Sequence, residues 1–339
     1  MSTPSFACFG EILIRLAAPG RELLLQTPRL EAHIGGAEAN VAVGLAMLGM
    51  RARMISVVAD NPLGEAALGE LRRRNVDAAA VGRAPGRMGL YFLTTGAVRR
   101  PSEVLYDRHG SAFAESDPEG YDWSSLLKGA DWLHLSGVTP AIGQKAAAAA
   151  VAAARTANDI GVRVSFDGNY RAQLWKRWKG DGPSTLRNIL DCAEIAFINE
   201  RDVELILGMS FEGADISERR ERAYEAAFAA FPRLKLIAAT NRIQHGVDHH
   251  EISGVLASRV GKTELRACDL PGVVDRIGAG DAFAAGVHYG LASGKGDQYA
   301  IDFGVAAAAL KHSIPGDMNL ASVQQIEAAM EGGALDVRR

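Results

Sequence analysis

The chain has 339 residues, of which 48% are apolar, and a formal net charge of -3 at pH 7. This length and composition are enough to bury a sizeable core in one large or two ordinary domains, and the slight negative charge excludes a general attraction to nucleic acid or to anionic lipid. Three widely spaced cysteines exclude a disulfide framework. The longest run of small apolar residues, at 146–154, is too short to span a bilayer. We therefore expect a soluble cytoplasmic protein, with neither a nucleic acid nor a membrane as partner.

Two stretches in the first third of the chain, about residues 12–33 and 88–109, have the short alternating pattern of antiparallel strands with turn residues between them. No linker or low-complexity segment sets them apart. We therefore expect one domain over residues 1–339, with these strands inserted as a small antiparallel β lid that covers a ligand crevice. The exposed edge of such a lid favours a homo-oligomer formed through it.

The rest of the chain alternates between short apolar runs and helical stretches. Near-continuous apolar runs are typical of parallel strands that are covered on both faces, and here they predict strands at 54–58, 132–135, 162–166, 195–198 and 236–239. Periodicity and capping residues predict helices at 37–48, 62–74, 143–158, 183–191, 200–207, 217–231, 281–293 and 298–311. The predicted fold class is α/β, with a mainly parallel central sheet and helices on both faces.

A polar or turn residue follows each predicted strand. Because parallel strands end at the same edge of a sheet, these residues should gather there, and the ligand crevice of such a fold lies outside that edge. The residues are Asp60, Ser136, Asp167, Asn199 and Thr240.

A glycine pair precedes the first predicted helix, in His33-Ile-Gly35-Gly36-Ala-Glu-Ala-Asn40. Without side chains at Gly35 and Gly36 the backbone can lie against a ligand, and Asn40, one turn inside the helix, can hydrogen-bond that ligand. The alternative is a tight turn followed by an ordinary polar helix residue.

A second glycine segment, Asp275-Arg-Ile-Gly278-Ala279-Gly280-Asp281-Ala-Phe283, stands at the start of a later helix. Gly278 and Gly280 allow torsions that turn several N–H groups toward one point, and the unpaired amides and positive dipole end of the helix favour an anion such as phosphate. A carboxylate repels phosphate unless it accepts a proton from an attacking hydroxyl, so Asp281 is either a general base or a helix cap. The glycine spacing excludes a dinucleotide-binding fingerprint.

The two glycine segments, in this order and at this separation, resemble the PfkB, or ribokinase-like, family of carbohydrate kinases over nearly the whole chain. The resemblance implies a ribokinase-like fold, ATP and Mg²⁺ as cofactors, and a lid over the sugar. It implies that Asp281 is the catalytic base, while the backbone of Gly278, Ala279 and Gly280 holds the charge on the transferred group.

Three further segments, at 106–112, 167–171 and 311–317, resemble the 2-keto-3-deoxygluconate kinases of this family. They imply ATP-dependent phosphorylation of that sugar acid to 2-keto-3-deoxy-6-phosphogluconate. The alternatives are a kinase of the fructokinase or ribokinase type, or a non-catalytic sensor of sugar or nucleotide.

Two arginines near predicted strand ends suit an acidic substrate, because a guanidinium grips a carboxylate through a planar fork. We predict that Arg108 and Arg171 bind the sugar carboxylate; the alternative is that they form surface ion pairs. Tyr91 and Tyr106, on the lid strands, would add hydroxyl contacts and an apolar wall, unless they only pack the lid. The other predicted substrate contacts are Gly35, Gly36, Asn40 and Asp281.

The resemblance places the nucleotide along Asn169, Asn199, Thr240, Gly246, Gly278 and Gly280. Glu200 is predicted to order Mg²⁺ through water, since this ion is held by few protein ligands together with phosphates and water; the alternative for Asn199 and Glu200 is helix capping. The sequence departs from the commoner family pattern at Arg276-Ile277 and at 239–245. Because of the first departure, the use of a monovalent cation beside the second glycine segment is not carried over.

Overall fold

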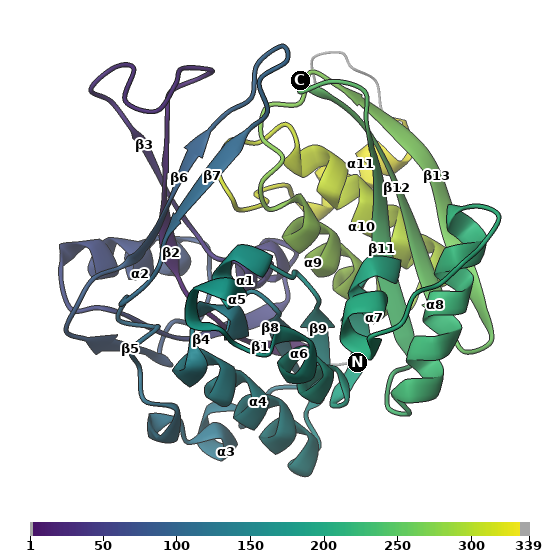
Figure 1. Ribbon diagram of the computed structural model, residues 1–339, viewed down its shortest axis with the longest axis horizontal. Coiled ribbons are helices and arrows are strands. Elements are labelled where there is room, and N and C mark those ends of the chain that lie inside the picture. The colour runs from purple at the N-terminus through teal and green to yellow at the C-terminus, as the bar shows by residue number, and fades with distance from the viewer. Residues whose placement is uncertain (1–2, 333–339) are drawn as a thin grey trace.

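A nine-stranded sheet forms the centre of the computed structural model, which describes residues 3–332 (Figure 1). The strand pairs from β5 to β11 are all parallel, and β12 and β13 extend the sheet in antiparallel fashion beyond β11. In sheet order the strands are β13 (Gly261–Pro271), β12 (His249–Ser258), β11 (Leu236–Gln244), β10 (Ala193–Phe197), β9 (Arg163–Asp167), β8 (Trp132–Ser136), β1 (Ser5–Phe9), β4 (Arg51–Ala59) and β5 (Val81–Ala84).

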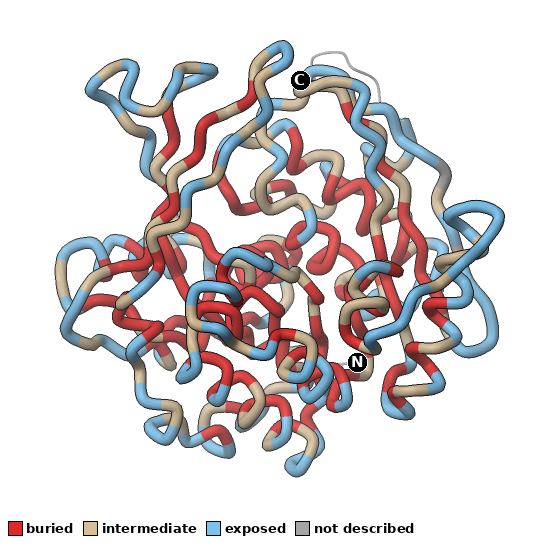
Figure 2. The backbone as a smooth tube through the Cα atoms, in the orientation of Figure 1, coloured by how far each residue is buried: buried red, intermediate tan, exposed pale blue. Residues whose placement is uncertain are grey.

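Helices cover both faces of this sheet. Successive side chains of a strand point to opposite sides, so the apolar strands make both faces of the sheet apolar. On β1, Phe6 and Cys8 belong to one core cluster, and Ala7 and Phe9 belong to the other. The first cluster packs against α1 (Ala37–Met47), α2 (Pro62–Arg73), α9 (Ala279–Ala292) and α10 (Asp297–Lys311), and α11 (Val323–Met330) packs behind α10. The second packs against α3 (Trp123–Leu126), α4 (Gln144–Asp159), α5 (Ala172–Trp178), α6 (Gly182–Leu190), α7 (Glu200–Leu207) and α8 (Ile216–Ala230). Figure 2 shows the buried residues concentrated along the sheet and the inner sides of these helices.

A smaller sheet projects from the main body (Figure 1), in the order β3 (Glu31–Gly35), β2 (Leu13–Ala17), β6 (Gly89–Thr94) and β7 (Glu103–Asp107). Its outer pairs are antiparallel, as the sequence pattern predicts, while the central pair of β2 with β6 is parallel. Ile277, in the loop before α9, packs against the buried cluster of this sheet. The lid therefore rests on the segment that leads into α9.

The predicted α/β fold is confirmed, and each predicted strand and helix is present, although β4 and β11 run several residues further than expected. The sequence did not predict β1, which lies in the middle of the sheet, nor the edge strands β5 and β13, nor the helices α3, α5 and α11. After β1 the chain enters the lid instead of a helix, so the strand and helix alternation that supports the other assignments is missing there. Within residues 3–332 no helix is long and apolar enough to cross a membrane. The single domain and the homo-oligomer formed through the lid stay predictions.

Candidate active site

The glycine segment before α9 forms a tight turn, residues 277–281, which we call the anion turn. Gly278 is the N-cap of α9 and has a φ of 81°, in the left-handed region that favours glycine. A Cβ at Gly278 would overlap the carbonyl oxygen of Asp317, so the turn lies directly against that later loop. The backbone N–H groups of Gly280 and Asp281 have no acceptor within residues 3–332, which leaves them available to an anion.

Asp281 is buried at this turn, and it does not cap α9, because the cap position is Gly278 and no side chain bonds to the helix end. Its Oδ2 accepts a hydrogen bond of 2.7 Å from Nδ2 of Asn40. Burial raises the pKa of Asp281 to about 7; the bond from Asn40 opposes this shift, and the charge of Asp317 adds to it. A carboxylate with a pKa near neutrality is suited to accept a proton at physiological pH.

A cavity of about 340 Å³ lies between the lid strands and the anion turn. We call it the lid cavity. It brings together nearly all of the predicted substrate residues, namely Gly36, Asn40, Tyr91, Tyr106, Arg108, Arg171 and Asp281. Gly35 stands just outside it, at the end of β3, where a Cβ would overlap the carboxylate of Asp317. At Gly36 a Cβ would overlap the carbonyl oxygen of Glu11, so both glycines are needed for close approach to protein atoms. That a ligand lies against this backbone stays a prediction.

Arg108 lines the lid cavity but is not a free cation. It is buried, and its Nε donates to Oε2 of Glu11 at 2.6 Å. Ser111 also donates to the Glu11 carboxylate through its hydroxyl. Arg108 thus forms an ion pair that is buried, not the surface ion pair considered as the alternative, and this pair fixes the guanidinium at the cavity wall.

Arg171 differs from Arg108, because it is exposed and forms no ion pair within the described part of the chain. Its Nη1 donates only to the carbonyl oxygen of Tyr170, at 3.1 Å. The side chain lines the lid cavity and also a second cavity. This arginine is therefore available to an anionic ligand.

Asp317 and Arg15 line or support the lid cavity without having been predicted as site residues. Asp317 is buried, accepts a 2.7 Å hydrogen bond from the hydroxyl of Tyr91, and lies 3.0 Å from Nη1 of Arg15. Burial raises the pKa of Asp317, and the Arg15 charge opposes the shift. Nη2 of Arg15 donates to Asp275 at 2.6 Å, so one lid arginine joins two carboxylates on separate loops. The sequence feature that could have indicated Arg15 is its position as a charged residue within the otherwise apolar strand β2.

The second cavity, of about 480 Å³, lies outside the ends of β9, β10 and β11 and beside the start of α7. We call it the α7 cavity. It is lined by predicted nucleotide residues Asn169, Asn199 and Thr240, and it shares four lining residues with the lid cavity: Asp167, Asn169, Arg171 and Gly280. The two cavities therefore meet at the anion turn, where a group could pass from one to the other.

Asn169 occupies this junction in an unusual backbone conformation. Its φ is 34°, in a region that side chains rarely adopt, and its Nδ2 donates to the hydroxyl of Ser136 at 2.9 Å. Strain at such a position is typical of functional sites.

Gly246, which was also predicted to contact the nucleotide, lies in the turn between β11 and β12. Its N–H donates to the carbonyl of His249, and it lines neither cavity.

Two carboxylates of the α7 cavity have raised pKa values. Burial raises the pKa of Asp202 to about 6. Burial, together with repulsion from Asp281 and Asp202, raises the pKa of Asp167 well above its usual range. Arg171 opposes both shifts and lines the same cavity together with Arg201, yet neither carboxylate forms an ion pair within residues 3–332. Carboxylate oxygens without an ion-pair partner are donors that a cation such as magnesium could bind.

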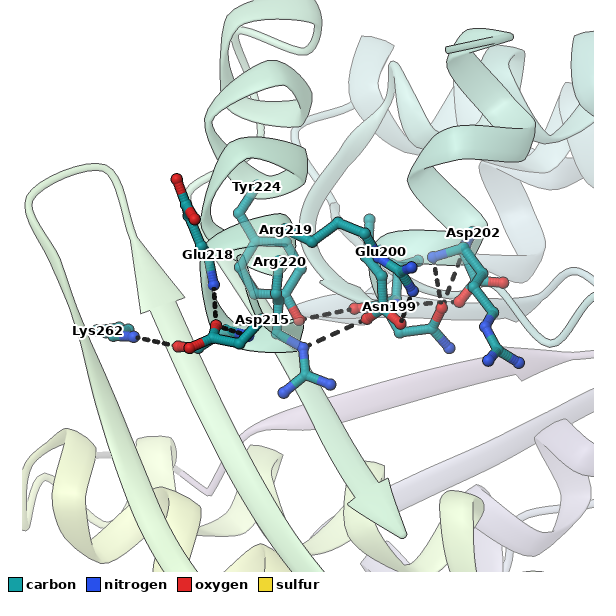
Figure 3. A network of polar contacts seen from close by, with 12 residues as sticks. Asn199, Glu200, Asp202, Asp215, Glu218, Arg219, Arg220, Tyr224 and Lys262 are labelled. Carbon is teal, nitrogen blue, oxygen red and sulfur yellow. Dashed lines mark hydrogen bonds and ion pairs between the residues drawn. The ribbon is translucent and has the colours of Figure 1, made fainter. Parts of the chain in front are cut away.

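At the start of α7, Asn199 caps the helix and Glu200 forms ion pairs with α8 (Figure 3). Oδ1 of Asn199 accepts from the N–H groups of Arg201 and Asp202, and Asp202 accepts from the N–H of Asn199, which is a complete capping box. The Glu200 carboxylate lies 3.4 Å from Arg219 and 3.3 Å from Arg220 of α8. Glu200 does not line the α7 cavity, so the arrangement gives no support to a contact with magnesium-bound water, and Asp202 faces the cavity in its place.

Comparison with known proteins places this geometry in a family. A family model described as pfkB family carbohydrate kinase matches residues 3–323. The chain is 30% identical to a 2-dehydro-3-deoxygluconokinase of Thermoproteus tenax (92% of this chain, 90% of the relative) and 28% identical to a 2-dehydro-3-deoxygalactonokinase of Haloferax volcanii (99% and 100%). The crystal structure of 2-dehydro-3-deoxygluconokinase from Thermotoga maritima superimposes with a TM-score of 0.91 at 36% identity, covering 97% of this chain and 100% of that one.

Proposed function

The chain belongs to the pfkB family of carbohydrate kinases, and we propose that it transfers the γ-phosphoryl group of ATP to the terminal hydroxyl of 2-keto-3-deoxygluconate, the sugar acid also called 2-dehydro-3-deoxygluconate. The observation that carries the proposal is that Arg108, Arg171 and Asp281 line one cavity. A sugar acid whose carboxylate is held by the arginines can present its other end to the base. The names of the relatives from Thermoproteus tenax and Thermotoga maritima support the same substrate class.

Asp281 would accept the proton of the substrate hydroxyl while the oxygen attacks the phosphorus. Asn40 holds Oδ2 of this carboxylate, which leaves Oδ1 for the substrate. The N–H groups of Gly280 and Asp281, which have no protein acceptor among the described residues, would stabilise the negative charge on the transferred group. The carboxylate that would accept the proton and the N–H groups that would bind the anion therefore both belong to the first turn of α9.

The lid cavity would hold the acceptor through its two ends. Arg171, which has no other ion-pair partner within residues 3–332, would bind the carboxylate, while Glu11 keeps Arg108 in place beside it. Tyr91 and Tyr106 would contribute hydroxyls and an apolar wall. Because the lid covers the acceptor, it would also exclude water that could compete for the phosphoryl group.

The α7 cavity would hold ATP, with its phosphates directed toward the anion turn. Asp167 and Asp202 fit a magnesium ion, because they are oxygen donors that line this cavity and form no ion pair within the described residues. These two carboxylates would hold Mg²⁺, directly or through its water shell. The ion would supply positive charge beside the ATP phosphates.

The experiment that tests this function is a measurement of ADP release with magnesium ATP over a panel of sugar acids, neutral hexoses, ribose and nucleosides. We expect the highest kcat/KM with 2-keto-3-deoxygluconate. The panel includes 2-keto-3-deoxygalactonate, since the Haloferax volcanii relative is named for that substrate. A higher kcat/KM with fructose or ribose would replace the proposed acceptor, and stabilisation by ligands without any ADP release would indicate a sensor.

A further inference from the structure

Lys311, the last residue of α10, has a buried ammonium group that the mechanism above does not use. The whole residue is 0% exposed. Its Nζ donates to two backbone carbonyl oxygens, that of Ile314 at 2.8 Å and that of Asp275 at 3.3 Å. Within residues 3–332 no carboxylate forms an ion pair with it. A buried charge without a paired carboxylate is costly to keep, so the position of this ammonium calls for an explanation.

Both of its acceptors belong to the support of the anion turn. Asp275 lies two residues before the turn: its N–H donates to the carbonyl of His312 at 3.1 Å, and its carboxylate accepts from the N–H groups of Ile277 and Gly316, each at 3.0 Å. Ile314 belongs to the loop that runs from the end of α10 to Asp317. Lys311 therefore joins the two segments between which the anion turn is held.

The other contacts of this loop reinforce the same connection. Gly278 lies against the carbonyl of Asp317, and Arg15 of the lid joins Asp317 to Asp275. Lys311 lines neither the lid cavity nor the α7 cavity. Any effect on the reaction must therefore pass through the groups that Lys311 supports, which are the anion turn and the loop that ends at Asp317.

We propose that Lys311 is a positioning residue for phosphoryl transfer, whose ammonium clamps Asp275 to the loop after α10 and adds a fixed positive charge behind the anion turn. The clamp holds the N–H groups of Gly280 and Asp281 in the direction of the transferred group. Preorganised donors of this kind lower the barrier without having to reorient during the reaction. The inference rests on the proposed function only in that the turn receives a phosphoryl group.

The charge of this ammonium depends on pH in a way that can be measured. Burial lowers the pKa of Lys311 to about 8, while Asp275, Asp317 and Asp281 oppose the shift and Arg15 adds to it. The ammonium is present below that pH and is lost above it. We expect kcat/KM, which reports the free enzyme, to fall above about pH 8 in the natural protein. In Lys311→Arg the fall should move to higher pH, because a guanidinium stays charged.

The main test is Lys311→Ala, assayed in ammonium chloride and in sodium chloride at equal ionic strength with the best acceptor from the panel above. We expect kcat to fall about 10- to 100-fold, somewhat less than for the loss of a direct oxyanion donor, with KM for the acceptor changed less than about threefold. Ammonium, but not sodium, should restore part of kcat by filling the vacated position. The matched control is Phe303→Leu, which loosens the buried packing of α10 and should lower Tm while leaving kcat near the natural value.

The proposal is overturned if Lys311→Ala keeps its kcat, loses no more than Phe303→Leu does, or responds equally to ammonium and sodium. If Lys311→Ala does not fold, the test becomes the dependence of kcat/KM on pH in the natural protein and in Lys311→Arg. The proposal is overturned if kcat/KM falls at the same alkaline pH in both proteins. Because the comparison uses whichever acceptor the natural protein phosphorylates best, a wrong sugar acid would appear in the panel and leave this test intact.

Discussion

The lid cavity and the α7 cavity meet at the anion turn, yet the buried charges on the lid side of this junction differ in their pairing from those at the junction and beyond it. On the lid side of the junction the buried charges are paired within the protein: Arg108 with Glu11, and Arg15 with Asp275 and Asp317. At the junction and in the α7 cavity, Asp281, Asp167 and Asp202 have no ion-pair partner within residues 3–332, and burial raises their pKa values.

The difference follows from what each cavity would receive. A sugar acid brings a single charge and many hydroxyls, so its site needs side chains that are fixed in place before binding, and paired charges provide this. Magnesium ATP brings the cation with it, so its site can leave carboxylates without an ion-pair partner until the ligand arrives. Four substitutions test this contrast.

The largest effect is expected at the junction of the cavities, with Asp281→Asn. The amide keeps the shape of the side chain but cannot accept a proton, so kcat should fall about 10²- to 10⁴-fold, while sugar binding measured by calorimetry is largely kept. Asp297→Asn, at the exposed start of α10, is the matched control and should leave kcat unchanged. Turnover near the natural rate in Asp281→Asn would contradict the assignment of the base.

The pairing in the lid cavity is tested by Glu11→Gln, which leaves the guanidinium of Arg108 buried without its carboxylate. Removal of one partner from a buried ion pair destabilises a protein by about 3 to 5 kcal/mol, and urea unfolding should show a loss of that order. Glu115→Gln breaks an exposed pair with Lys145 and should cost less than about 1 kcal/mol. Equal losses in the two variants would mean that Arg108 is not fixed by Glu11.

Arg171→Ala tests the arginine that the protein leaves unpaired. A hydrogen bond to a charged group contributes about 1.5 to 3 kcal/mol, so kcat/KM for the sugar acid should fall about 10- to 150-fold. For neutral hexoses it should hardly change. Arg177→Ala, on the exposed side of α5, is the control. If Arg171→Ala weakens activity on both kinds of sugar alike, the carboxylate of the substrate is not its ligand.

The sequence predicted the parts of this site whose chemistry is local. Gly278 and Asp281 stand within one turn of α9, and the backbone conformation of that turn can be inferred from the glycines themselves. The hydrogen bond between Asn40 and Asp281 spans 241 positions, and it was not predicted, although both residues were named as substrate contacts.

The charges that hold the lid cavity could not be predicted in the same way. Arg108 was recognised as a candidate, but its partner Glu11 lies 97 positions away, and Arg15 lies 260 positions from Asp275. A charged residue in a lid strand gives no indication of which loop it will meet. Glu200 shows the converse, since a carboxylate at a strand end near the α7 cavity is engaged by Arg219 and Arg220 of α8, a helix further along the chain.

The smallest expected effect tests Asp202, a carboxylate of the α7 cavity that has no ion-pair partner within residues 3–332. Since burial raises the pKa of Asp202 to about 6, its charged form disfavours the folded state, and this destabilisation develops as pH rises from about 4, the usual pKa of aspartate, to the folded value. Asp202→Asn removes that charge while its amide oxygen can still accept from the N–H of Asn199. We therefore expect the variant to be more stable by about 1 kcal/mol at pH 7 and to show no gain near pH 4.

Activity should change in the opposite direction, because the KM of Asp202→Asn for magnesium ATP should rise while its stability increases. A variant that is less stable at pH 7, or that binds magnesium ATP as well as the natural protein, would show that this carboxylate is already balanced within the fold. The contrast between the cavities would then be lost, because the protein would have fixed the charges of both before either ligand binds.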